Sequence, residues 1–259
     1  MTRVLGIVSG KGGVGKTTIT ANLGIGLSKF GKKAIIVDCN LSTPHLNYYL
    51  GADDFKITLN EVLKGETEIT SALYHHNGVM YVPASQEMAD LVDVDVMRLK
   101  KNVKKLMNPD MIDFIILDSA PGLGREAMSV FEAADEIVFV STPLEPNIQD
   151  IERCLEIVKE LNKQPLGLIL NMVGEGKYEM NTKQIKDMAK MPIIGTVPFD
   201  KNIPNSIALR KPILKFKPHS KTSNSIMRIV ASITGEKFKP SPHQKVFQFF
   251  DVMRELVAR

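Results

Sequence analysis

One stretch decides the fold of this 259-residue chain: Gly10-Lys11-Gly12-Gly13-Val14-Gly15-Lys16-Thr17-Thr18. It follows a short apolar run at residues 4–9 and opens a helix-forming segment at residues 16–30. A glycine-rich turn of this spacing, between a strand and a helix, is the pattern of a phosphate-binding loop. The alternative, a glycine-rich turn that binds nothing, leaves the Gly-Lys-Thr ending unexplained. The stretch therefore predicts a nucleotide-binding α/β protein.

Each part of the loop has an expected role in binding ATP with Mg²⁺. The glycines let the backbone aim its N–H groups at phosphate oxygens, and the helix adds its positive N-terminal end. Lys16 is expected to contact the β- and γ-phosphates, and the Thr17 hydroxyl to join the Mg²⁺ shell. The nucleotide-binding loop is predicted to comprise Gly10, Lys11, Gly12, Gly13, Val14, Gly15, Lys16, Thr17 and Thr18.

Apolar runs alternate with segments of helical periodicity along the chain, which is typical of a parallel sheet covered by helices. Right-handed crossovers then predict a doubly wound, mostly parallel sheet with helices on both faces. The expected strands are residues 4–9, 34–37, 79–82, 113–117, 136–141, 166–171 and 193–197. The expected helices are residues 16–30, 86–107, 124–133, 147–162, 181–189 and 220–234.

The composition is that of an ordinary globular protein, with a mild formal charge of +4. Cys39 and Cys154 are isolated and cannot form a disulfide framework or a four-thiolate metal site. We therefore expect a reducing, cytoplasmic setting and no iron–sulfur cluster. No apolar run approaches the ~18 residues that would indicate a membrane span.

A composition break divides the chain near residue 235. Residues 236–243 contain two prolines and little apolar pattern, which predicts a linker. The chain is therefore expected to consist of an ATPase domain at 1–235, a linker at 236–243 and an amphipathic helix at 244–259.

Lys11 adds a second lysine to the loop, directly after its first glycine. With it, the chain resembles the MinD/ParA family of deviant Walker A ATPases, and within that family the archaeal MinD-like proteins. In the family this lysine crosses a dimer interface to the phosphates of the partner's nucleotide. The resemblance implies an ATP-dependent homodimer in which Lys11 stabilises charge that develops during hydrolysis. The alternative is a solvated loop lysine.

The resemblance extends over residues 2–235 in the family's order. Two strand-end motifs, closing in Asp38 and Asp118, imply that these aspartates support Mg²⁺. Either could instead cap the following helix. Asn171 resembles the residue that recognises adenine, and the segment lining the base is matched by Pro198, Phe199 and Asp200.

Asn40 departs from the family, whose MinD-like members carry an aspartate two positions after the first strand-end aspartate. An amide can orient a water molecule, but it cannot accept the water's proton as a base. We therefore expect slow hydrolysis and a long-lived ATP-bound dimer, with Lys11, Lys16, Asp38 and Asn40 as the catalytic set.

The predicted C-terminal helix carries one apolar stripe: Val246, Phe249, Phe250, Met253, Leu256 and Val257. Such a helix can lie in a bilayer interface, and relatives of MinD end in a membrane-targeting helix of this kind. The helix could instead pack on the protein itself or in a dimer. The resemblance therefore implies reversible attachment to the inner face of the cell membrane when ATP is bound.

Two basic runs leave a second function open. They could hold non-specific DNA, as in ParA-like relatives, although such runs are more often solvated faces. An activating or cargo protein is a further expected partner, and small-molecule kinase chemistry remains an alternative. The runs are Arg98, Lys100, Lys101, Lys104 and Lys105, and then Arg210, Lys211, Lys215, Lys217 and Lys221.

Overall fold

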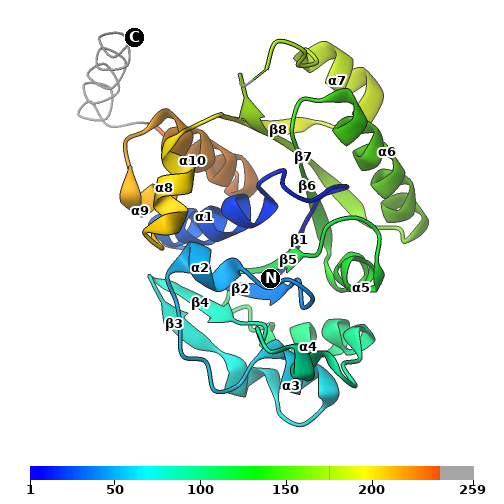
Figure 1. The fold of residues 1–259 in the computed structure, drawn as a ribbon, viewed down its shortest axis with the longest axis vertical. Helices are drawn as coiled ribbons and strands as arrows, with labels where there is room; N and C mark the ends of the chain where they lie inside the picture. Colours follow the sequence, from blue (N-terminus) through cyan, green and yellow to red (C-terminus); the bar gives the residue numbers. More distant parts are fainter. Residues whose placement is uncertain (175, 240–259) are drawn as a thin grey trace.

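β1 (Arg3–Val8) lies inside an eight-stranded sheet in the computed structural model, which describes residues 1–174 and 176–239 (Figure 1). The strand order is β3-β4-β2-β5-β1-β6-β7-β8, and every neighbouring pair is parallel except β3 with β4. The doubly wound α/β fold is confirmed. The strand bounds are β2 (Ala34–Cys39), β3 (Tyr74–His76), β4 (Val79–Val82), β5 (Phe114–Ser119), β6 (Glu136–Ser141), β7 (Gln164–Val173) and β8 (Ile193–Pro198).

Helices cover both faces of the sheet (Figure 1). Side chains from α3 to α7 pack in the core on one face, and those from α1, α2, α9 and α10 pack on the other. The helix bounds are α1 (Lys16–Lys29), α2 (Leu46–Leu50), α3 (Leu59–Lys64), α4 (Leu99–Leu106), α5 (Arg125–Ala133), α6 (Glu145–Glu160), α7 (Thr182–Ala189), α8 (Asn202–Ala208), α9 (Ile213–Phe216) and α10 (Lys221–Thr234).

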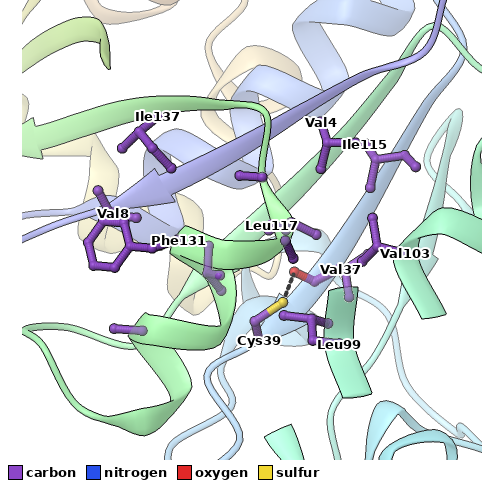
Figure 2. Packing of buried hydrophobic residues seen from close by; sticks show 14 of the residues in the cluster. Val4, Val8, Val37, Cys39, Leu99, Val103, Ile115, Leu117, Phe131 and Ile137 are labelled. Carbon is purple, nitrogen blue, oxygen red and sulfur yellow. Dashed lines mark hydrogen bonds between the residues drawn. The ribbon is translucent and has the colours of Figure 1, made fainter. Parts of the chain in front are cut away.

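The central strands are apolar on both faces, because successive side chains point to opposite cores. On β5, Ile115 and Leu117 enter the core under α4 and α5, whereas Ile116 enters the core under α1. Figure 2 shows the first of these cores, with Phe131 of α5 close to the strand residues. This two-sided burial explains why the strands read as short continuous apolar runs in the sequence.

The expected helix at residues 86–107 is wrong in its first half. That segment forms two 3₁₀ turns, η2 (Met88–Leu91) and η3 (Val96–Arg98), before α4 begins at Leu99. The side chain of Asp95 accepts a bond from the backbone N–H of Met97, and Asp90 accepts one from the Ser85 hydroxyl. Such local side-chain bonds compete with helical backbone bonds, so the helical pattern is overridden.

The sheet reverses its strand order around β1, which lies between β5 and β6. In open α/β sheets, ligands bind beyond the carboxyl ends of the strands at such a reversal point. The glycine-rich loop follows β1 at this point. Asp38 and Asp118 lie near the carboxyl ends of β2 and β5, where they are register partners.

The last described helix, α10, ends at Thr234, and Gly235 follows in a left-handed conformation. The domain boundary near residue 235 stays a prediction, because the expected helix at 244–259 and part of the expected linker lie outside the described residues. Among the described residues, no helix is both long and apolar enough to cross a bilayer.

Candidate functional site

The loop from Gly10 to Gly15 joins β1 to α1 and needs glycine for two physical reasons. Gly13 and Gly15 have φ values of 80° and 85°, which side chains other than glycine rarely adopt. A Cβ on Gly15 would also lie 2.1 Å from Nδ2 of Asn171, and one on Gly10 would lie 2.5 Å from Cβ of Asp150. The loop is therefore held closely between β7 and α6, with its backbone free to face a ligand.

Asp118 anchors the start of α1 through three side-chain bonds. The Lys16 ammonium lies 3.0 Å from Oδ1 in a buried ion pair, and Thr20 donates to the same oxygen at 2.7 Å. Thr17 donates to Oδ2 at 2.8 Å. The sequence placed Lys16, Thr17 and Asp118 together correctly. It missed Thr20, whose position one helical turn after Lys16 was the available signal.

Asp38 lies beside Asp118, and among the described residues it accepts hydrogen bonds from the loop that follows β2. Its carboxylate accepts from the backbone N–H of Asn40 at 3.2 Å and from that of Leu46 at 3.3 Å. Burial, and then the negative charge of Asp118, raise the pKa of Asp38 to about 8. A cation at this position would relieve both effects.

The residues at this edge fit a magnesium ion. Asp38, Asp118 and the Thr17 hydroxyl offer oxygen atoms, which Mg²⁺ prefers. The described residues contain no group of three or more His, Cys, Asp or Glu side chains that could hold a metal ion. A magnesium ion here would therefore complete its shell with phosphate oxygens and water, as is usual for nucleotide-bound Mg²⁺.

Lys11 lies on the tip of the loop, with its side chain exposed. Its backbone carbonyl accepts a bond from the Ser9 hydroxyl at 3.0 Å, which fixes the loop rather than the ammonium group. The Lys11 side chain is thus exposed, whereas the Lys16 ammonium is buried in its ion pair. An exposed cation next to a phosphate cradle can reach a group outside its own subunit.

Asn40 is engaged with its own loop. Its Nδ2 donates to the backbone carbonyl of Thr43 at 2.8 Å, and its Oδ1 accepts from the Thr43 hydroxyl at 3.1 Å. Both ends of the amide are used in this small ring. These two bonds hold the Asn40 side chain against Thr43 and leave one N–H and one oxygen lone pair of the amide for other partners.

The residues expected around the base lie at the ends of β7 and β8. Asn171 donates through Nδ2 to the Val14 carbonyl at 2.9 Å, so its amide also supports the phosphate loop. The pairing of β7 with β8 is irregular next to Asn171, where Met172 has a φ of 57°. Asp200 accepts from the Thr222 hydroxyl at 2.7 Å and from the Asn202 backbone at 2.8 Å.

A hollow of about 350 Å³ adjoins this segment. Phe199 is about half exposed beside it, whereas Pro198 lines it together with α10. Asn171 and the segment 198–200 thus lie near the carboxyl ends of β7 and β8, at the same edge of the sheet as the phosphate loop. The lining residues are Val173, Thr196, Pro198, Lys221, Asn224, Ser225 and Arg228.

Cys39 and Cys154 are both buried and lie on different elements, β2 and α6. The Cys39 thiol donates to the Val37 carbonyl at 3.7 Å inside the core (Figure 2). Burial raises the pKa of the Cys39 thiol well above its usual range, so it stays protonated.

Known proteins are similar to this chain over most of its length. Residues 1–234 match the family model described as "ParA: NUBPL iron-transfer P-loop NTPase". An uncharacterized ATP-binding protein of Methanocaldococcus jannaschii is 32% identical over 96% of this chain and 94% of its own length.

Two solved structures are similar over most of their length. The cell division ATPase MinD of Pyrococcus furiosus is 31% identical, with a TM-score of 0.87 over 91% of this chain and 99% of that one. The septum site-determining protein MinD of Pyrococcus horikoshii, complexed with Mg-ADP, is 31% identical, with a TM-score of 0.86 over 90% and 96% of the two chains.

Proposed function

Since this chain belongs to the ParA family of P-loop NTPases, we propose that it is a MinD/ParA-like ATPase that binds ATP with Mg²⁺ and forms a homodimer when ATP is bound. The observation that carries the proposal is the pair of lysines in one loop. Lys16 is buried against Asp118, and Lys11 is exposed at the tip. A buried lysine suffices for binding phosphates in one subunit, so the exposed one is free to serve a second subunit.

In this proposal the loop residues hold the triphosphate, and the carboxylates of Asp38 and Asp118 support Mg²⁺. The metal supplies positive charge that offsets charge on the transferred phosphoryl group. Lys11 from the facing subunit adds a further positive charge, as an arginine finger does. Asn171 and the segment 198–200 border the base, next to the hollow lined by Pro198.

The test is light scattering of the protein with Mg²⁺ and either ADP or a slowly hydrolysed ATP analogue. We expect monomers with ADP and dimers with the analogue, and Lys11→Ala to remain monomeric while still binding nucleotide. Lys33→Ala removes an exposed lysine from the opposite end of β2 and serves as the matched control. Dimers of Lys11→Ala at the wild-type yield contradict the proposal.

We further propose that hydrolysis is slow and that the dimer acts as a spatial switch at the membrane. Support for slow hydrolysis comes from Asn40, whose amide is held by Thr43. Support for membrane attachment comes from the apolar stripe predicted at residues 244–259, and two such helices in one dimer would bind more firmly than one. Liposome flotation with ATP and ADP, using the full chain and a truncation after Gly235, tests it. Equal flotation of both proteins contradicts membrane attachment.

Binding of non-specific DNA is the second candidate. On α4, Lys100, Lys101 and Lys104 are exposed, which favours it. Other members of the basic runs have local partners: Lys105 pairs with Glu68, and Arg210 pairs with Asp53. Salt-dependent DNA retention that requires ATP would favour this function over membrane attachment.

A further inference from the structure

Glu126 connects two loops that border the phosphate site. It lies in the first turn of α5, directly after the loop that follows β5. Its carboxylate reaches across to Ser42 in the loop after β2, 84 residues away in sequence. The Ser42 hydroxyl donates to Oε1, and the Ser42 backbone N–H lies 3.4 Å from Oε2. Both carboxylate oxygens therefore face one residue, and we call this contact the Ser42–Glu126 clamp.

The clamp acts on a loop whose other bonds are internal. Asp38 holds the two ends of the loop through the N–H groups of Asn40 and Leu46. Thr43, the neighbour of Ser42, occupies both ends of the Asn40 amide. Holding Ser42 in place therefore also restrains Thr43 and, through it, the Asn40 amide.

The segment that precedes Glu126 is bonded to the residue before the phosphate loop. Gly122, four residues before Glu126, has a φ of 77°, and its N–H donates to the Ser9 carbonyl at 2.9 Å. Ser9 directly precedes Gly10. A continuous set of contacts therefore runs from the phosphate loop through Gly122 and α5 to the loop that contains Asn40.

We propose that Glu126 is a positioning residue that couples the two loops and restrains ATP hydrolysis while the Ser42–Glu126 clamp is closed. This rests on the proposed ATPase function. Opening the clamp releases Ser42 and Thr43, so that Asn40 can turn toward the attacking water. The clamp thereby adds a restraint beyond the loss of a carboxylate at position 40.

The experiment is a double-mutant cycle on the full chain with Glu126→Ala, Ser42→Ala and both together. Steady-state ATPase rates give kcat and KM, and a fluorescent ATP analogue gives nucleotide affinity. Each single variant is expected to raise kcat about threefold, with KM changed less than twofold, and the double variant to match the single ones, since both remove the same contact. Glu132→Ala, farther along α5, is the matched control.

Hydrogen exchange adds a readout that a general loss of packing would not produce. Glu126→Ala should speed exchange at the amides of residues 40–46, which lie on a different element, and leave α5 unchanged. Additive rates, a fall in kcat, a change confined to KM, or unaltered exchange at residues 40–46 would overturn the proposal. A wild-type protein that neither binds nor hydrolyses ATP would instead refute the proposed function.

Discussion

Asp38 and Asp118 are the same residue type at register-paired positions of neighbouring strands, yet their surroundings differ. Asp118 receives a lysine ammonium and two hydroxyls from α1. Asp38 receives two backbone N–H groups of its own loop, and its pKa is raised to about 8. Asp118 therefore fixes the start of α1, whereas Asp38 orders the loop that follows β2. Position on the strand determines where a carboxylate lies, but its neighbours determine what it does.

The largest expected effect is the loss of stability when Asp118 is removed. Asp118→Asn leaves the Lys16 ammonium buried without its ion pair, which should lower the free energy of unfolding by about 3–5 kcal/mol. Urea denaturation at pH 7, without nucleotide or Mg²⁺, measures it. Asp110→Asn, an exposed substitution, should change the same quantity by less than ~0.5 kcal/mol. A loss under ~1 kcal/mol for Asp118→Asn would show that Asp118 is not the anchor.

Asp38→Asn should raise the free energy of unfolding, whereas Asp118→Asn should lower it. The pKa of an unfolded aspartate lies near 3.8, whereas that of Asp38 in the folded chain is raised to about 8. Between these values the folded chain holds more protons, so the wild-type protein loses stability as the pH rises. Asp38→Asn removes that loss, so the variant should be more stable than wild type at pH 8.5 and nearly as stable as wild type at pH 4.

Thermal unfolding from pH 4 to 8.5 in Mg²⁺-free buffer tests the Asp38 prediction. Adding Mg²⁺ with ADP should narrow the difference in stability between Asp38→Asn and wild type, because a bound cation favours the ionised carboxylate of Asp38. A difference that does not grow with pH would place the Asp38 pKa near its ordinary value.

A carboxylate in the loop after β2 should speed hydrolysis. Asn40→Asp supplies a group that can accept a proton from water, and we expect single-turnover hydrolysis to rise about 10-fold, the equivalent of ~1.4 kcal/mol in the barrier. The binding of ATP should be unaffected. An unchanged rate would mean that position 40 does not limit turnover.

The smallest effects are expected when one hydroxyl that bonds to Asp118 and one that bonds to Asn40 are removed separately. Thr20→Val removes a bond to Asp118 in a buried site and should cost about 1 kcal/mol of unfolding free energy. Thr43→Val removes the exposed bond to Asn40 and should cost less than ~0.5 kcal/mol. Urea denaturation of both variants measures the two losses of unfolding free energy. Equal losses would mean that the bond to Asp118 stabilises the fold no more than the bond to Asn40.

The central part of the site could be predicted because it depends on short-range patterns. Apolar runs that end in Asp38 and Asp118, and the spacing of Gly10 to Thr17, place these groups at one edge of a parallel sheet. The Ser42–Glu126 clamp could not be predicted, since no periodicity links residues 84 positions apart.

The errors in secondary structure have a related cause. The segment at residues 86–98 has helical periodicity, but the side chains of Asp90 and Asp95 form local bonds that decide its actual conformation. The three-residue edge strand β3 and the helices α2, α3, α8 and α9 were not predicted. A helix of seven residues or fewer spans at most two turns, which is too short to show the helical period.

The place of β1 in the sheet has a consequence for the newly made chain. The phosphate loop leaves the ribosome before either strand that flanks β1, because Val4 pairs with Ile115 and Val8 pairs with Phe139. Both flanking strands of β1 must be synthesised before it is enclosed, which at typical elongation speeds of about 5–20 residues per second delays it by several seconds. The nascent protein thus cannot enclose β1 until β6 has been translated, and a chaperone acting on it would meet an exposed, apolar β1 during that interval.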